Sequence, residues 1–200
     1  MSSVLKRRSR ANPSGRKPAL GRDAWLNAAR DALIREGVGA VQIGRLARSL
    51  GVTRGGFYWF FDSRRQLLKE LAADWEHTNT AAFKQVLQDS GHNGVAEFQA
   101  ITDIWVNERS YSPAWDSAMR DWARTAKAIA NAVRRVDDER IEILKQIFLD
   151  MGYDEDEAFV RARIVYFHQI GYYTLDVQES RQQRLRLLPL YVRILTGQAS

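Results

Sequence analysis

Apolar residues recur at helical spacing near the start of the chain. They stand at positions i, i+3, i+4, i+7 and i+8 and form one stripe: Trp25, Ala28, Ala29, Ala32 and Leu33. Gly37 follows directly after Glu36, and glycine most easily adopts the left-handed conformation that ends a helix. The pattern predicts a helix from Asp23 to about Glu36.

A second, shorter stripe precedes a glycine turn. Its members are Ile43, Leu46, Ala47 and Leu50. Gly51 and Val52 then interrupt the pattern, and Thr53 is a favourable N-cap for a third helix over Arg54 to about Phe60. Residues 43–60 therefore predict two helices joined by a tight turn, which is the pattern of a helix-turn-helix.

The rest of the chain continues in helical periods. After Asp62 and Ser63, which have the character of an N-cap, a stripe continues for about twenty residues. Further helices are expected over 95–109, 113–124, 125–149 with a possible break, 155–175 and 180–196, the last with a kink at Pro189. No strand or repeat is indicated, and the predicted fold class is all-α.

Charge is divided unevenly along the 200 residues. Residues 1–70 contain 15 Lys and Arg against 5 Asp and Glu, a net charge of +10; residues 71–200 contain 15 against 19, a net charge of −4. Residues 1–20 have little to bury and are predicted to form a basic, disordered arm. Such an arm is either a solubilising tail or a segment that contacts phosphates or a minor groove.

Composition excludes several classes of function. The chain has no cysteine, which removes disulfides, thiolate metal sites and thiol nucleophiles. Its three histidines, His77, His92 and His168, are scattered, and no catalytic or phosphate-binding motif is present. We therefore expect no catalytic residues, no metal and no cofactor. The longest apolar run is interrupted by charge and the N-terminus does not resemble a signal peptide, so a cytoplasmic protein without a membrane segment is expected.

Residues of the predicted third helix divide by face. Phe57 and either Phe60 or Phe61 would point toward the first two helices, whereas Arg54 and Tyr58, and likewise Gly55 and Trp59, stand four apart on the opposite side. An arginine can bond guanine or phosphate, and an aromatic side chain can contact phosphate or a thymine methyl. Gly55 and Gly56 each cost about 1 kcal/mol relative to alanine in a helix. Either a close approach of the backbone to DNA or a frayed first turn would account for them.

The stretch that carries these residues resembles the DNA-binding domain of the TetR family of transcriptional regulators. The resemblance covers about residues 22–70 and rests on the Leu-Gly-Val-Thr turn at 50–53, the aromatic run from Phe57, and the basic residue before Leu67 and Leu68. It implies that these residues meet DNA: Arg45, Thr53, Arg54, Gly55, Gly56, Tyr58, Trp59 and Arg64. The sequence departs from the usual family pattern at Ile43, Gly44, Phe60 and Asp62.

The resemblance also implies a homodimer formed by the last two helices. Their apolar positions are Phe159, Ala162, Val165 and Ile170 in one helix and Leu187, Tyr191 and Ile194 in the other. Two recognition helices related by a two-fold axis read a palindrome, which one short helix is too small to do. The alternative is a monomer whose last helices close its own core.

Between the two modules the resemblance implies a cavity for a small-molecule effector. Aromatic and polar residues that could line it are Trp75, Trp105, Trp115, Met119, Trp122, His168 and Tyr172, which would suit an aromatic or apolar ligand. Each is equally compatible with core packing, and His168 with a buried, hydrogen-bonded histidine.

The resulting interpretation has three segments: a basic arm at 1–20, a DNA-binding domain at 21–68, and an effector-binding and dimerisation domain at 69–200. The expected function is that of a dimeric repressor released from a palindromic operator by an effector. A non-specific or architectural DNA-binding protein without an effector is the alternative.

Overall fold

The computed structural model describes residues 21–89, 91 and 93–197, so the predicted arm at 1–20 lies outside the described part. Every regular element in that part is helical, which confirms the all-α prediction. The elements are α1 (Arg22–Glu36), η1 (Val38–Ala40), α2 (Ile43–Leu50), η2 (Arg54–Trp59), α3 (Arg64–Asp89), α4 (Gly94–Asn107), α5 (Pro113–Ala123), α6 (Lys127–Asp150), α7 (Glu155–Thr174) and α8 (Arg181–Thr196).

Short polar side chains fix where several helices begin. Ser112, Asp154 and Ser180 each accept a hydrogen bond from the backbone N–H three residues later, at 3.3, 2.8 and 3.2 Å. These bonds satisfy amides that have no partner inside the helix. The possible break within 125–149 does not occur, because α6 is continuous, and Pro189 lies inside α8.

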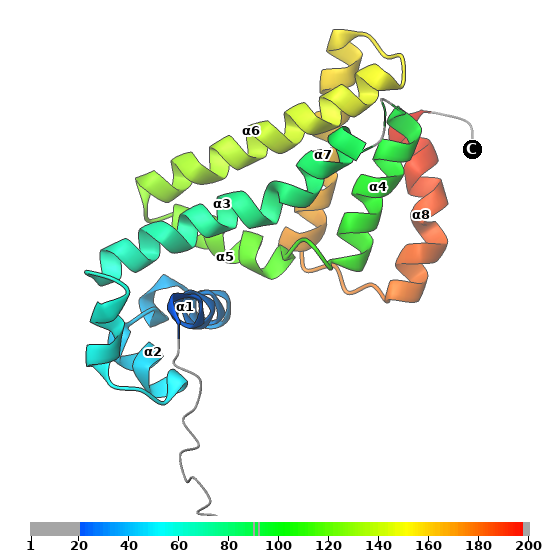
Figure 1. Cartoon of the computed structure of the whole chain (residues 1–200). Coiled ribbons are helices and arrows are strands. Elements are labelled where there is room, and N and C mark those ends of the chain that lie inside the picture. The colour runs from blue at the N-terminus through cyan, green and yellow to red at the C-terminus, as the bar shows by residue number, and fades with distance from the viewer. Residues whose placement is uncertain (1–20, 90, 92, 198–200) are drawn as a thin grey trace, which may run out of the picture.

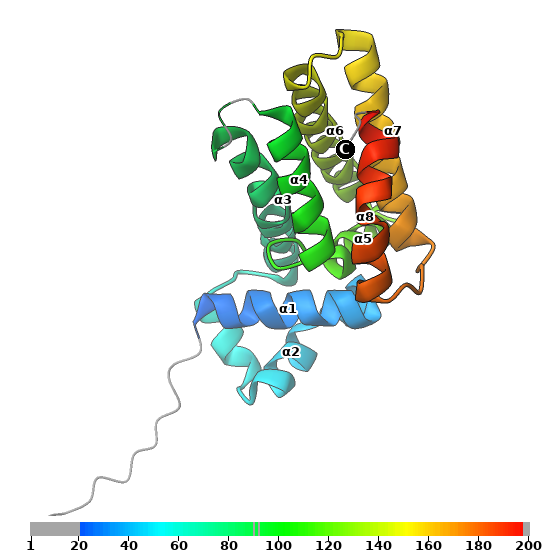
Figure 2. The ribbon, with the colours of Figure 1, turned by 90° about the vertical axis from the view of Figure 1, so that its right-hand side faces the viewer.

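The helices form a small N-terminal unit joined to a larger body. In Figure 1, α1 and α2 lie at one end of the molecule, and α3 leads from this unit into the body, where it packs along α6. Figure 2 shows α1 crossing beneath the ends of the body helices, with α7 and α8 on the opposite side of the body from α3. No helix in the described part is long and apolar enough to cross a membrane.

One hydrophobic core joins the N-terminal unit to the near end of the body. It contains Trp25 of α1, Phe57 of η2, Trp75 of α3 and Met119 of α5. A second core lies farther along, between α3, α4, α6 and α7. The boundary proposed at 68/69 falls inside α3, so the two proposed domains share a helix as well as a core.

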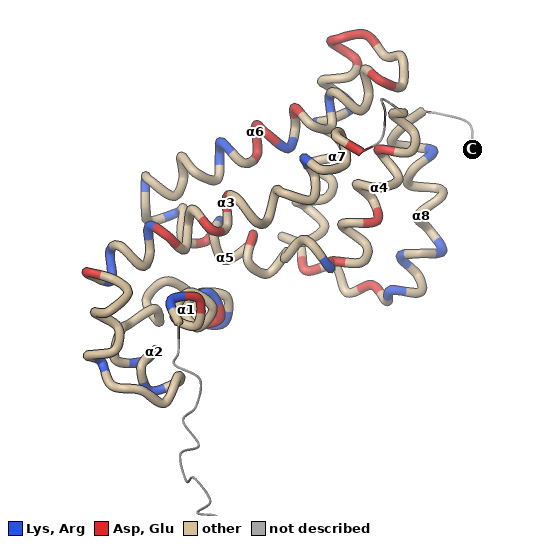
Figure 3. Tube along the Cα trace, in the orientation of Figure 1, with Lys and Arg blue, Asp and Glu red and all other residues tan. Residues whose placement is uncertain are grey.

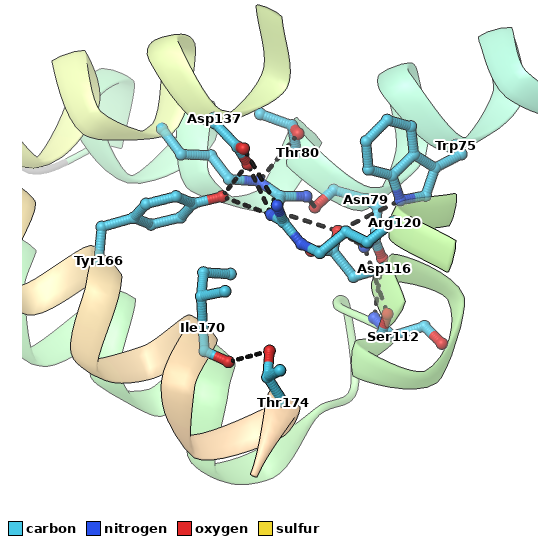
Figure 4. A network of polar contacts seen from close by, with 11 residues as sticks. Trp75, Asn79, Thr80, Ser112, Asp116, Arg120, Asp137, Tyr166, Ile170 and Thr174 are labelled. Atoms are coloured by element: carbon cyan, nitrogen blue, oxygen red, sulfur yellow. Dashed lines mark hydrogen bonds and ion pairs between the residues drawn. The ribbon is translucent and has the colours of Figure 1, made fainter. Parts of the chain in front are cut away.

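A buried polar network connects four body helices, with α7 joined through Tyr166, whose hydroxyl donates to Asp137 at 2.6 Å (Figure 4). Arg140, only 1% exposed, donates to Asp116 at 3.0 Å, and the same carboxylate accepts from Trp75 Nε1 at 3.2 Å and Asn79 Nδ2 at 3.0 Å. Arg120 bridges Asp116 to Asp137 on α6. The network ties α3, α5 and α6 together through paired charges, which is the condition for burying ionised side chains.

Candidate nucleic-acid interface

A tight turn sets η2 against α2. Gly51 adopts a left-handed conformation with φ of 68°, and Val52 N donates to the carbonyl oxygen of Ala47 at 3.0 Å. η2 is a 3-10 helix rather than the α-helix that the pattern predicts. Thr53 occupies the N-cap position with an extended backbone, but its side chain makes no capping hydrogen bond, which leaves the hydroxyl exposed for other contacts.

The inner side of η2 is held by stacked aromatic rings. Phe57 is fully buried, meets Trp25 edge-on at 5.3 Å between ring centroids, and stacks on Phe61 at the same distance. Of the two alternatives for the second inward ring, Phe61 is buried in the core and Phe60 lies half-buried at its margin. This packing fixes the orientation of the opposite side of η2.

The outer side of η2 exposes two large aromatic side chains. Tyr58 is 60% exposed and Trp59 is 86% exposed, and Thr53, Arg54 and Gly55 are exposed beside them. A nearly bare indole leaves a large apolar surface in water, and such surfaces in soluble proteins commonly mark binding sites. The structure therefore brings together, on one outward face, five of the residues that the sequence predicted to meet DNA.

Arg54 lies over a glycine of the neighbouring helix. A Cβ atom placed on Gly44 would come within 2.7 Å of the Arg54 guanidinium nitrogens, so only glycine leaves room for the side chain in this position. Among the described residues, Arg54 has no hydrogen bond or ion pair. A larger residue at position 44 would need only the flexible, exposed end of Arg54 to move aside, so this contact does not by itself require glycine there. Sequence reasoning missed the contact because the two residues are ten positions apart.

No internal contact requires Gly55 or Gly56. A Cβ at Gly55 would meet only the Thr53 hydroxyl, at an ordinary 3.7 Å, and a Cβ at Gly56 would meet no atom within 4 Å. Neither residue has a positive φ. The fold would accept alanine at both positions, so internal packing does not account for the glycines.

The two flanking arginines predicted to contact phosphate already have partners. Arg45 forms an ion pair with Glu36, and this hydrogen bond lowers the pKa of the Glu36 carboxyl. Arg64 donates to the carbonyl oxygens of Val41 and, at 2.7 Å, Val38, so that it ties the start of α3 to η1. Arg64 lies at the start of α3, as expected, but its guanidinium already donates hydrogen bonds within the fold.

Two cations that the prediction did not include are exposed in the same region. Arg48 lies on α2 and Arg65 in the first turn of α3, next to Arg64. Figure 3 shows basic positions along α2 and at the start of α3. The sequence signal was present in the pair Arg64 and Arg65, but only the fold distinguishes the arginine that holds carbonyls from the one that faces water.

Comparison with known proteins agrees with this geometry. Residues 26–71, which span most of α1 through the start of α3, match the model of the bacterial regulatory proteins of the tetR family. This part of the chain therefore resembles the corresponding segment of tetR-family regulatory proteins. A segment of 56 residues is 32% identical to TtgW, an HTH-type transcriptional regulator of Pseudomonas putida; it covers 28% of this chain and 42% of that protein, so the match spans less than half of the relative's length.

Solved TetR-family structures share the fold over nearly the whole chain. A TetR transcriptional regulator from Legionella pneumophila superposes with a TM-score of 0.64 at 17% identity, covering 88% of this chain and 95% of that one. A TetR-family regulator from Bordetella parapertussis gives 0.62 at 20% identity, covering 90% and 97%. The family that residues 26–71 match is described as bacterial regulatory proteins.

The body of the chain does not gather the predicted effector residues into one cavity. Trp105, His168 and Tyr172 line a cavity of about 60 Å³ between α4, α7 and α8. Four other residues lie elsewhere and form or border the first core: Trp75, Trp115, Met119 and Trp122. These four help α1, α3, α5 and α6 to pack the N-terminal unit onto the body.

His168 is not the buried, hydrogen-bonded histidine of the alternative interpretation. Its side chain is exposed on one side and lies 5.1 Å from the Tyr191 ring on α8. Partial burial lowers the pKa of its imidazole, and the neighbouring Arg184 lowers it further. No group of three metal-ligating side chains occurs among residues 21–89, 91 and 93–197.

Proposed function

We propose that this chain is a dimeric, sequence-specific transcriptional repressor that binds a palindromic operator through η2 and releases it on binding a small-molecule effector. The observation that carries the proposal is the outward face of η2, where Tyr58 and Trp59 are exposed beside Arg54. None of these three side chains forms a hydrogen bond or ion pair among the described residues, and their chemistry suits a nucleic acid.

The face offers complementary means of contacting DNA. A guanidinium such as that of Arg54 bonds two acceptors of a guanine edge or a phosphate, and the phenol of Tyr58 donates to phosphate. The indole of Trp59 supplies apolar contact with a thymine methyl or a sugar. Gly55 and Gly56 let the backbone of η2 approach the groove without a side chain in between. Arg48 and Arg65 add positive charge on either side.

Exposed apolar side chains on α7 and α8 support a homodimer. On α7, Phe159, Ile164 and Phe167 are each more than 40% exposed, and on α8 Leu190 and Ile194 are also exposed. Of the predicted stripe, Ala162 and Val165 face inward instead and belong to the chain's own core. An apolar surface of this kind in a single chain is the usual mark of a partner surface.

Release by an effector needs a connection between the body and η2. The first core supplies a continuous one, because Phe57 of η2, Trp25 of α1 and Met119 of α5 belong to the same buried cluster. A ligand that binds one arrangement of the body better than another shifts the population toward that arrangement, by no more than the difference in its affinities.

Selection of bound sequences from a random duplex pool, with the full chain, tests the proposal. We expect enrichment of an inverted repeat whose half-sites are about 34–36 Å apart or a multiple of that distance, as a two-fold dimer requires. Enrichment of a single unrepeated half-site would contradict the dimeric mode. Retention of DNA without any enriched sequence, with a steep salt dependence, would favour the non-specific DNA-binding alternative instead.

A further inference from the structure

The cavity between α4, α7 and α8 contains an amide that has no partner. Gln169 of α7 is 7% exposed and lines the cavity, yet its Nε2 makes no hydrogen bond among the described residues. Leaving such a donor buried and unsatisfied costs about 1–3 kcal/mol. Buried amides in native proteins are nearly always bonded, so an unpaired one that faces a cavity marks the place of a missing acceptor.

The remainder of the wall is mostly apolar. α4 contributes Phe98, Trp105 and Val106, and α8 contributes Leu188 and Val192. These side chains provide a flat, aromatic and aliphatic surface that favours a carbon skeleton over water. The ring of Trp105 is almost fully buried and belongs to the second core, which gives the cavity a rigid inner wall.

Polar groups of the wall other than Gln169, His168 and Tyr191 have bonds within the protein. His168 and Tyr191 are exposed, and their ring centroids lie 5.1 Å apart. Thr102 donates to the carbonyl oxygen of Phe98 at 2.7 Å, and Tyr172 donates to Glu179 at 3.2 Å. Arg184 contacts Glu108 at 3.4 Å and lies over the Tyr172 ring at 4.6 Å. Because Glu179 and Arg184 offset each other in charge, the wall as a whole does not select an anion, and the free donor of Gln169 is the feature that selects.

From these contacts we infer that the cavity is a binding site for a small, uncharged aromatic molecule with one carbonyl oxygen, which accepts the hydrogen bond of Gln169 Nε2. The inference deepens the proposed function and rests on it for its regulatory meaning, since it assigns the effector's place and chemical class. The ring lies between Trp105 and Leu188, and the carbonyl oxygen faces α7.

The cavity's covering helix can yield to such a ligand. At about 60 Å³ the cavity has room for a few water molecules, each of which needs about 10–15 Å³, and an aromatic ring needs more. α8 forms the outer wall, and Thr196 is its only buried residue among those described. Tyr191 of α8 both lines the cavity and is exposed on the surface proposed for the dimer. Entry of the ligand would thus displace a helix of that surface.

Acetophenone and ethylbenzene, which have similar shapes and differ in the carbonyl oxygen, are suitable probes, with benzoate as the charged counterpart. Binding to the full chain is followed by ¹H–¹⁵N chemical-shift titration of the Gln169 side chain and of the backbone amides of α4, α7 and α8. We expect saturable shifts with acetophenone and about tenfold weaker binding of ethylbenzene, the loss that corresponds to one hydrogen bond to a buried donor. Benzoate is expected to bind more weakly than acetophenone, because its charge must be desolvated.

Gln169→Leu separates this role from a structural one. The variant removes the unpaired amide, so the free protein should be at least as stable as the wild type, and the tenfold preference for acetophenone should disappear. Gln88→Leu, at an exposed position on α3, is the matched control and should keep the preference.

Three results would overturn the inference: no saturable shifts with acetophenone, equal binding of acetophenone and ethylbenzene by the wild type, or an unchanged preference in Gln169→Leu. Tighter binding of benzoate than of acetophenone would overturn the assignment to an uncharged ligand. None of these measurements contains DNA, so a failure here is distinct from a failure of operator binding.

Discussion

Single residues determine what η2 can present to DNA. Phe57 and Trp25 hold its inner side, so the orientation of Tyr58 and Trp59 on the outer side follows from packing that a sequence pattern can predict. Arg54 lies over Gly44, a residue of another helix, and no periodicity reveals that contact. The individual contacts of a recognition element therefore need the structure, even where the element itself does not.

Gly56 allows a prediction at this scale. Gly56→Ala adds a methyl group where the free chain has no atom within 4 Å, so we expect the free energy of unfolding to stay the same or rise by up to about 1 kcal/mol. The affinity for the selected operator should fall about tenfold, because the methyl group would keep the backbone from the groove. Urea denaturation and fluorescence anisotropy with labelled operator measure the two quantities.

Gly39→Ala is the control for this substitution. Gly39 lies in the other 3-10 helix, η1, and a Cβ there also meets no atom within 4 Å. It should leave both stability and operator affinity nearly unchanged. Unaltered operator binding by Gly56→Ala would show that the glycine serves only the local backbone.

At the scale of elements, helix starts are the most predictable feature. Ser112, Asp154 and Ser180 are recognisable caps because the bond that each makes is local in sequence. The inner face of α7 is much less predictable: Ala162 and Phe167 both fit an apolar stripe, and only packing against α6 sends one inward and leaves the other exposed. For the same reason, tertiary packing and not the apolar pattern determines that Trp75 lies in the first core and Trp105 in the second.

Asp116 allows a prediction about how the body helices are held together. Asp116→Ala removes the acceptor for Arg140, Trp75 and Asn79 at once and leaves the arginine charge buried. We expect the free energy of unfolding to fall by about 3–5 kcal/mol, as measured by urea denaturation followed by circular dichroism. Asp121→Ala, at an exposed position of the same helix, should change it by less than about 0.5 kcal/mol. Similar midpoints for the two variants would show that the network does not stabilise the body.

At the scale of the whole molecule, the N-terminal unit and the body are parts of one packed structure. The first core runs through both, and α3 crosses the boundary that charge and composition indicated. Charge does change along the chain, from +10 over residues 1–70 to −4 over residues 71–200. The two parts thus differ in charge although they share one core.

The proposed dimer surface gives a prediction at this scale. Phe167→Glu places a charge in the middle of the exposed apolar face of α7, so we expect the dimer dissociation constant to rise by at least about 30-fold, with the helical content unchanged. Sedimentation equilibrium measures the constant. Val95→Glu, an equally exposed apolar position on α4, is the matched control. A Phe167→Glu variant that remains as dimeric as the control would place the interface elsewhere.

The most direct test of the central claim is the affinity of the Arg54→Ala, Tyr58→Ala double variant for the selected operator and for a random duplex, measured by fluorescence anisotropy. Both side chains are exposed, so the variant should fold normally. Each lost contact is worth about 1–3 kcal/mol, so operator affinity should fall by at least about 30-fold, close to that for random duplex. Arg134→Ala, an exposed arginine on α6, should bind the operator as the wild type does. Operator binding by the double variant at wild-type affinity would contradict the assignment of DNA recognition to η2.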